Sequence, residues 1–294
     1  MFSKRMKEDL VGILYILPFG IIWLIFSAWP TIYGFVISLY DWNPLKGSKF
    51  LGFGNYIYLF THNRFWNSLF RTLEFAGIFI ILTLLLALSF AFLLYFFPKS
   101  KTRTFSESFL FFPYLLNVSV IALIWKWLLD PDFGLITYYI SSILGKAPRF
   151  LNSIFWAVPA IALASAWWLS GYRTTIFLTA LETVPKELVE SAKIDGAGTW
   201  IIMWKILFPL IRPQFLFSLV LTTISGFTAL GQVMIMTDGG PGNASEVLAL
   251  YLYRLGFQYF DMGKAAAAGS VLVVIMFVLT LVGMKILGLG GEIE

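Results

Sequence analysis

The side chains of this sequence that could do chemistry at a surface are gathered between residues 184 and 212. Acidic side chains such as Glu190 alternate there with apolar ones, and Gly196 follows an aspartate in a pair that favours a turn. We expect one short helix over about 186–194 and a second, amphipathic one over 199–207. Such helices expose carboxylates and apolar side chains together, which suits docking onto another protein rather than catalysis.

Composition excludes most other kinds of site. The chain has no cysteine and a single histidine, His62, among loop-like residues, so a disulfide or a cysteine or histidine metal site is not expected. No G-x-x-x-x-G-K-[ST] phosphate-binding loop occurs. The clustered acids or histidines that an intramembrane enzyme needs are also lacking. We therefore expect no enzyme activity, no catalytic residue, and no metal or cofactor bound by this chain.

The composition is that of a membrane protein. Of 294 residues, 59% are hydrophobic and 13% are charged, whereas soluble domains carry about 25% charged residues. A span needs about 20 mostly apolar residues, and these runs lack the alternation of a barrel strand. The expected fold class is all-α, a polytopic membrane protein with six transmembrane helices and a cytoplasmic helix–turn–helix. The predicted spans are 10–39, 69–97, 109–129, 154–181, 215–236 and 265–287.

Basic residues set the expected orientation. The first apolar run follows Lys4, Arg5 and Lys7, and it is too long for the hydrophobic region of a signal peptide, so we interpret it as a retained span. Eleven lysines and arginines lie on the side of the N-terminus and six lie opposite, so the positive-inside rule predicts that both termini are cytoplasmic. The external segments are then 41–68, 130–153 and 237–264. The expected parts are a cytoplasmic N-terminus (1–9), a first transmembrane helix with its external loop (10–68), a core domain (69–287) with a cytoplasmic loop (184–212), and a cytoplasmic C-terminal tail (288–294).

The 184–212 segment contains a spaced motif that resembles a known family. Glu190-Ser191-Ala192 is followed by Gly196, then Ile206 and Pro209, at the intervals of Glu-Ala-Ala-x3-Gly-x9-Ile-x-Leu-Pro. This is the signature of the inner-membrane permeases of binding-protein-dependent ABC importers, and the flanking residues resemble their carbohydrate, maltose-type branch. The resemblance implies that the segment is a coupling loop that docks into an ATP-hydrolysing subunit. The residues it assigns to that docking are Glu190, Ala192, Asp195, Gly196, Ile206 and Pro209.

A second match to the same family begins at Thr237. The run Thr237-Asp-Gly-Gly-Pro, continued through Ala244-Ser-Glu, resembles an external loop of one permease half. By resemblance this region faces the solute-binding protein, although a simple connecting loop is the alternative for any single residue. The contact residues it implies are Gly239, Gly240, Pro241 and Arg254.

Alignment through the motif also implies a substrate pathway. Tyr172, Thr222, Ser225, Gly226 and Ala229 fall where the maltose-type permease lines its sugar site, and Arg173 and Gln232 are further polar residues inside spans. The alternatives are that Thr222 and Ser225 serve helix packing and that Arg173 lies near the cytoplasmic end and reaches the headgroups. A basic side chain facing the pathway would suggest an acidic or phosphorylated substrate.

The resemblance implies a permease subunit of an ABC importer that moves a sugar, oligosaccharide or related solute delivered by a solute-binding protein. Its expected partners are a second homologous permease, two ATP-binding subunits that hold ATP and Mg, the extracytoplasmic solute-binding protein and the lipid bilayer, with no nucleic acid. Its expected location is a bacterial or archaeal inner membrane. The alternative is a self-sufficient secondary transporter, which usually shows inverted repeats and membrane-embedded acids. No carboxylate lies clearly mid-span here.

Overall fold

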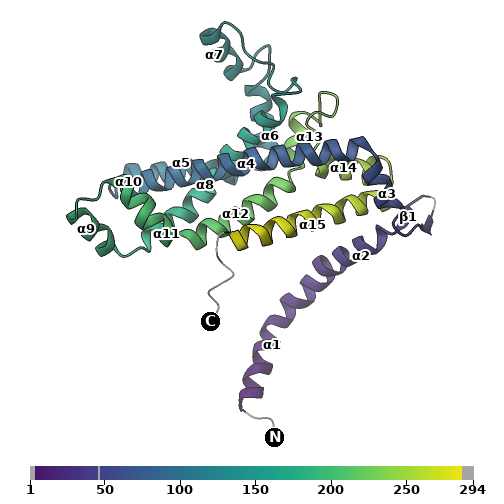
Figure 1. The fold of residues 1–294 in the computed structure, drawn as a ribbon, viewed down its shortest axis with the longest axis horizontal. Helices are drawn as coiled ribbons and strands as arrows, with labels where there is room; N and C mark the ends of the chain where they lie inside the picture. Colours follow the sequence, from purple (N-terminus) through teal and green to yellow (C-terminus); the bar gives the residue numbers. More distant parts are fainter. Residues whose placement is uncertain (1–3, 46, 287–294) are drawn as a thin grey trace. The chain divides into compact units, whose positions relative to one another are not determined.

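The computed structural model describes residues 4–45 and 47–286 (Figure 1), so the predicted C-terminal tail and the first three residues lie outside the described part. Helices dominate, as the fold class predicted, and inter-residue contacts divide the chain into two units. Each unit is described by itself. The units are residues 1–62 with 252–271, and residues 63–251 with 272–294.

The first unit opens with one long helical run. It consists of α1 (Lys4–Trp23), the π-helical η1 (Leu24–Ala28) and α2 (Trp29–Ile37), and its stretch Leu14–Ile37 is long and apolar enough to cross a membrane. Pro30 lies in the first turn of α2, where a missing amide is tolerated.

A short hairpin follows, which the prediction of an all-α fold did not include. β1 (Tyr40–Asn43) pairs antiparallel with β2 (Gly47–Phe50), and the rings of Tyr40 and Phe50 pack edge to face at 5.3 Å. The buried amide of Asn55, in α3 (Gly54–Thr61), donates to the main-chain oxygen of Tyr40 at 2.8 Å. Each strand of the hairpin has only four residues, so a search for long apolar runs does not detect it.

The second unit is built on its longest helix, α4 (Asn63–Phe96). Buried residues recur along α4 every three or four positions, as in Phe75, Phe79, Thr83 and Ala87, and this face packs on α8 (Ala157–Glu182). α5 (Lys101–Leu115) packs on α8, and α12 (Arg212–Phe227) packs on α4 (Figure 1).

Glycines let these helices approach closely. A Cβ on Gly171 of α8 would lie 1.8 Å from the carbonyl oxygen of Leu110 in α5. A Cβ on Gly226 of α12 would lie 3.2 Å from the ring of Phe79 in α4. The first position therefore admits no side chain without moving a helix.

Two predicted spans are not single straight helices. The predicted span 109–129 falls on α5 and α6 (Val118–Leu128), which are bent by 99° at a break where the side chain of Asn117 caps α6. The predicted span 215–236 divides into α12 and α13 (Gly231–Met236). A hydropathy run measures apolar length and does not detect such breaks.

The number of membrane crossings stays a prediction. Three helical stretches are long and apolar enough to cross a membrane, Leu14–Ile37, Asn63–Phe96 and Met262–Gly283, and there are up to five if each bent pair is one span. α8, the predicted fourth span, is not among them, and its middle carries the polar run Ser170–Thr175. The remaining helices are α7 (Leu135–Leu144), α9 (Lys186–Ile194), α10 (Thr199–Ile201), η2 (Ile202–Leu207), α11 (Phe208–Leu210), α14 (Leu248–Tyr253), η3 (Arg254–Gln258) and α15 (Met262–Ile286).

Candidate functional site

The 184–212 segment forms the two short helices and the turn that its sequence predicted. α9 ends in a turn in which the amide of Gly196 donates to the oxygen of Lys193 at 3.1 Å and that of Ala197 donates to the oxygen of Ala192 at 2.9 Å. These two bonds form a Schellman motif, which requires a left-handed residue after the helix. Gly196 provides it at φ +82°. We call residues 184–212 the coupling hairpin.

The coupling hairpin is anchored in a hydrophobic core. Val189 of α9, Ile202 and Leu207 of η2 and Ile211 are buried together with residues from the ends of α4 and α8. Burying such side chains stabilises a fold by about 1.5–3 kcal/mol each. The hairpin is therefore packed firmly on the ends of these two long helices.

The outer face of α9 mixes charge with apolar surface. Glu187, Glu190, Ser191 and Ile194 recur at helical spacing and are all exposed. Ile194 is 87% exposed, and Trp200 beyond the turn is exposed as well. A large apolar side chain held in the open beside carboxylates is typical of a protein interaction site.

The residues that the motif assigned to docking have two kinds of environment. Glu190, Asp195, Gly196 and Pro209 are exposed. Ala192 and Ile206 are half-buried and pack against the hydrophobic core of the hairpin. Their small or branched apolar side chains hold α9 against η2, so within this chain they shape the hairpin.

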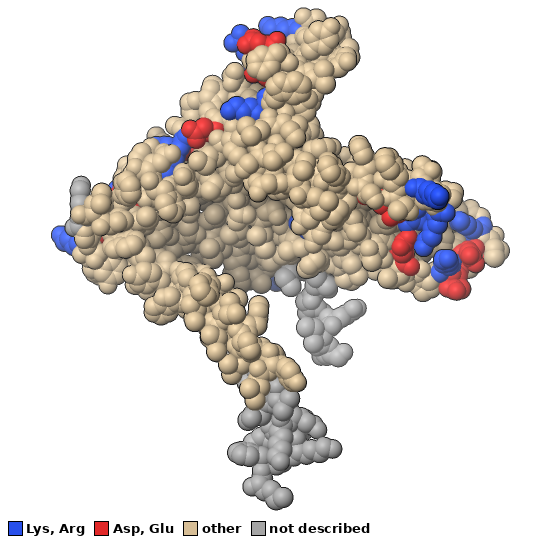
Figure 2. Space-filling view, turned by 180° about the vertical axis from the view of Figure 1, so that it is seen from behind, with Lys and Arg blue, Asp and Glu red and all other residues tan. Residues whose placement is uncertain are grey.

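A network of charged side chains lies at the end of the helical bundle to which the coupling hairpin is attached. It was not predicted from the sequence. Arg103 of α5 is buried and donates to Glu107 at 2.7 Å and to Glu182, the last residue of α8. Lys99 lies 3.7 Å from the same Glu182 carboxylate. Figure 2 shows blue and red atoms gathered at this end, where α9 lies, and few along the middle of the second unit.

The polar residues predicted inside the spans are brought together only in part. Arg173 of α8 is 4% exposed, its Nε donates to Thr222 Oγ1 of α12 at 3.2 Å, and its guanidinium lies 5.1 Å from the ring centre of Tyr172. Tyr172 in turn stacks on Tyr114 at 4.5 Å. The helices enclose the Arg173 side chain, which favours a place in the interior of the second unit over one at the headgroups.

Arg173 has no carboxylate partner among the described residues. Its Nη1 atom is buried and makes no hydrogen bond. Thr222 is fully buried and also donates to the main-chain oxygen of Ser218 at 2.6 Å. A buried cation held only by a hydroxyl and an aromatic ring is expensive unless a further partner reaches it.

The other predicted pathway residues are dispersed around this group. Ser225 donates to the main-chain oxygen of Leu221, and Gly226 packs against α4. Ala229 is buried at the break between α12 and α13, and Gln232 is half-buried in α13. Among the described residues, the side chain of Arg173 contacts Thr222 and Tyr172 rather than any of these four, so the cluster of Tyr172, Arg173 and Thr222 is the part of the prediction that forms one group.

The predicted binding-protein loop is held by a buried ion pair. Glu246 is 0% exposed, and its two carboxylate oxygens accept from Nε and Nη2 of Arg64 at 2.8 and 2.7 Å. Within the loop, Ser245 Oγ donates to the oxygen of Gly240 at 2.7 Å, and Gly239 lies at φ +76°. These contacts hold the loop that contains Gly239, Gly240 and Pro241 against α4. Arg254 begins η3 in the other unit and is half-buried.

Comparison with known proteins gives consistent matches over nearly the whole chain. Residues 83–288 match the family model described as "Binding-protein-dependent transport system inner membrane component". A probable ABC transporter permease protein, YurN of Bacillus subtilis (strain 168), is 29% identical over 97% of this chain and 99% of its own length. The trehalose/maltose transport system permease protein MalF of Thermococcus litoralis is 31% identical (94% and 92%), and the sn-glycerol-3-phosphate transport system permease protein UgpA of Shigella flexneri is 32% identical (92% and 92%).

The fold also matches solved structures. A chain of a bacterial alginate ABC transporter, crystallised with an alginate pentasaccharide-bound periplasmic protein, superposes with a TM-score of 0.83 at 23% identity, covering 96% of this chain and 95% of that one. At this identity the likeness is one of fold.

Proposed function

The chain belongs to the family of binding-protein-dependent transport system inner membrane components, and on that premise we propose that it forms the translocation pathway for a sugar, oligosaccharide or related solute. Its proposed partners are a second permease subunit, two ATP-binding subunits that supply ATP and Mg, and an extracytoplasmic solute-binding protein. The names of its relatives support the solute class, since they include transporters of maltose, of starch degradation products and of glycerol phosphate.

The coupling hairpin is the observation that carries this proposal. Its Glu190, Asp195 and Ile194 side chains are exposed, whereas Val189, Ile202 and Leu207 are buried against the ends of α4 and α8. Docked in a cleft of an ATP-binding subunit, the acidic side chains would pair with basic groups there. Closure of that subunit would then move the long helices, and rocking of the helices would alternate access to the pathway. This arrangement requires the hairpin and both termini to be cytoplasmic, as the basic residues predict.

The cluster of Tyr172, Arg173 and Thr222 is our candidate for the solute-contacting part of the pathway, together with Ser225, Gly226, Ala229 and Gln232. An aromatic face and hydroxyl groups suit a sugar. The unpaired Nη1 of Arg173 supports a solute that carries a carboxylate or phosphate as well as hydroxyls. On the external side, Gly239, Gly240, Pro241 and Arg254 are proposed to face the solute-binding protein.

Docking is tested with Glu190→Ala in the assembled transporter. We expect the ATP-binding subunits to co-purify less well with this variant and solute uptake to fall by about tenfold, the loss expected when one charge-assisted hydrogen bond disappears. The matched control is Asp132→Ala, which removes an exposed carboxylate from a predicted external turn. Equal co-purification and uptake for parent, Glu190→Ala and Gly196→Asp would contradict docking through this hairpin.

The solute class is tested by comparing Arg173→Gln with Arg173→Lys. Uptake of an anionic solute should be lost in the glutamine variant and partly kept in the lysine variant, whereas uptake of a neutral sugar should respond little. If Arg173→Gln and Arg173→Ala both leave uptake unchanged, Arg173 has no part in the pathway. Solute movement by this chain alone in proteoliposomes would instead favour the secondary transporter.

A further inference from the structure

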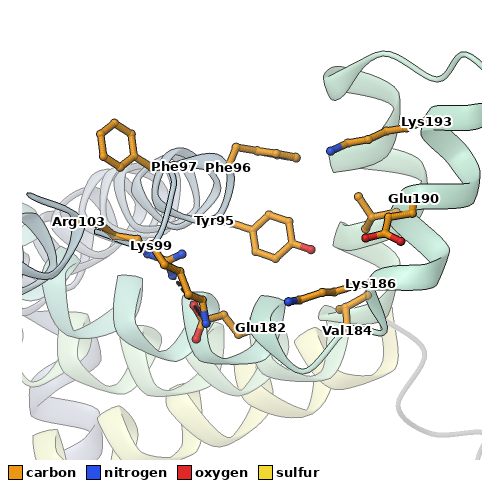
Figure 3. Close-up of a pocket in the computed structure, with 11 residues that line it drawn as sticks. Tyr95, Phe96, Phe97, Lys99, Arg103, Glu182, Val184, Lys186, Glu190 and Lys193 are labelled. Carbon is orange, nitrogen blue, oxygen red and sulfur yellow. Dashed lines mark hydrogen bonds and ion pairs between the residues drawn. The ribbon is translucent and has the colours of Figure 1, made fainter. Parts of the chain in front are cut away.

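A crevice of about 330 Å³ lies beside the coupling hairpin, on the side that faces the helix ends. Its walls come from the end of α4, the start of α5, the end of α8 and the inner edge of α9 (Figure 3). Two long helices end here, at Phe96 and Glu182, and a third begins at Lys101. Residues at such helix ends lie at the boundary between lipid and water.

The charges that line the crevice are mostly positive. Lys99, Arg103, Lys186 and Lys193 are opposed by two carboxylates. Glu182 is shared by Arg103 and Lys99, and Glu190 lies between Lys186 and Lys193 on the side of α9 that lines the crevice (Figure 3). In the described residues neither Lys186 nor Lys193 takes part in a hydrogen bond or an ion pair. Figure 3 shows both amines extending from α9 toward the opposite wall. The crevice therefore offers two free ammonium groups that can be brought onto one anion.

The wall across from these lysines is apolar. It is formed by Tyr95, Phe96 and Phe97, and Val189 of α9 adds a further apolar side chain to the lining. Free phosphate makes no apolar contact with such a wall, whereas the acyl chain of a phospholipid can pack against it. The combination of a basic pocket and an aromatic wall at helix ends is what recognises an anionic lipid headgroup.

We propose that this crevice binds the phosphate of an anionic glycerophospholipid between Lys186 and Lys193, with the acyl chains against the aromatic wall. The bound lipid would bridge α9 to the ends of α4 and α5, and so would stiffen the attachment of the coupling hairpin. The proposal rests on the hairpin lying at the membrane surface, which is part of the proposed function, but not on docking of the ATP-binding subunits.

The test is native mass spectrometry of the complete transporter in detergent, with phosphatidylglycerol titrated as individual molecules. The variant Lys186→Gln with Lys193→Gln should retain phosphatidylglycerol about thirty-fold less well than the parent, because each lysine near an anionic headgroup contributes about 1 kcal/mol. The matched control is Lys205→Gln with Arg212→Gln, two exposed basic residues of the same segment that do not line the crevice. The control and the variant Lys186→Arg with Lys193→Arg should both bind like the parent.

Each other outcome is decisive. Equal retention by the glutamine variant and the parent overturns the proposal, and so does an equal loss in the glutamine variant and the control. Inorganic phosphate, added in a separate arm, should not displace the lipid; if it does so at equal concentration, the site recognises phosphate alone and the lipid is wrong. The mass of the complex reports in the same spectrum whether the ATP-binding subunits remain, so a failure of docking is distinguished from a failure of lipid binding.

Discussion

The contact between α5 and α8 at Gly171 makes a specific prediction. A Cβ at Gly171 would lie 1.8 Å from the carbonyl oxygen of Leu110, whereas real Cβ atoms essentially never come within 3.0 Å of another heavy atom. In Gly171→Ala, α5 and α8 must therefore separate by at least about 1.2 Å at this point, and the obstructing atom is backbone, so no side chain can rotate away. Overpacking of this kind costs about 1–3 kcal/mol or more.

The comparison variant is Gly77→Ala. Gly77 also lies inside a helix, α4, but nothing lies within 4 Å of its Cβ position. Alanine is favoured over glycine in a helix by about 1 kcal/mol, so Gly77→Ala should be neutral or slightly stabilising. Gly171→Ala has the same helix preference and should nevertheless be destabilised by about 2 kcal/mol, since the clash exceeds that gain.

The assay is thermal unfolding of the purified chain in detergent, followed by the fluorescence of its 11 tryptophans. Gly171→Ala should unfold at a lower temperature than the parent, and Gly77→Ala should not. Uptake should fall as well, because Tyr172, which stacks on Tyr114 of α5, follows Gly171 directly. If the two alanine variants unfold at the same temperature, the close approach of α5 and α8 does not exist in the protein.

The other predictions concern charges and one turn. In Arg64→Gln the buried carboxylate of Glu246 loses its bidentate partner. We expect thermal unfolding to show a loss of stability of about 2–3 kcal/mol, less than for a fully buried pair because Arg64 is 35% exposed. Adding Glu246→Gln should recover part of this stability, and strictly additive losses would rule out coupling between the two residues. Gly196→Val should lower the stability of the turn by about 1–2 kcal/mol, because position 196 has a left-handed backbone; no clash adds to this, since the space around its Cβ position is open. Gly196→Asn should retain most of the uptake. Equal uptake by both variants would show that the turn is not needed. Arg103→Gln should lower the stability of the chain by only about 1 kcal/mol, because Glu182 is 38% exposed and water partly screens the pair. Limited proteolysis between α8 and α9 should become faster. Unchanged proteolysis would mean that the Arg103–Glu182 pair does not hold α5 to the end of α8.

The coupling hairpin could be predicted from sequence because its signals are local. Glu190 and Gly196 belong to a motif of fixed spacing, an aspartate–glycine pair marks the turn, and the apolar positions follow the helical period. The structure adds the two Schellman hydrogen bonds, which explain why the position after Asp195 favours glycine.

The two long-range ion pairs of the second unit could not be predicted, because their partners are far apart in sequence. Arg64 and Glu246 are separated by 182 positions, and Arg103 and Glu182 by 79. No local pattern relates such residues, and the positive-inside count used Arg64 and Arg103 only as indicators of topology. The breaks at Asn117 and after α12 were missed for a different reason, since apolar length was the sole criterion for a span.

The break between α12 and α13 interrupts the helical hydrogen bonding beside the proposed pathway. α12 ends at Phe227 and α13 begins at Gly231, so main-chain groups of the residues between them are not all bonded within a helix, and at membrane depth such groups are tolerated only beside protein or a water-filled cavity. Peptide groups can bond the hydroxyls of many different sugars, and a substitution at Ala229 does not remove them. Binding of sugars at this break can then depend little on the side chain at position 229. The choice between one solute and another would depend on neighbouring side chains such as Arg173.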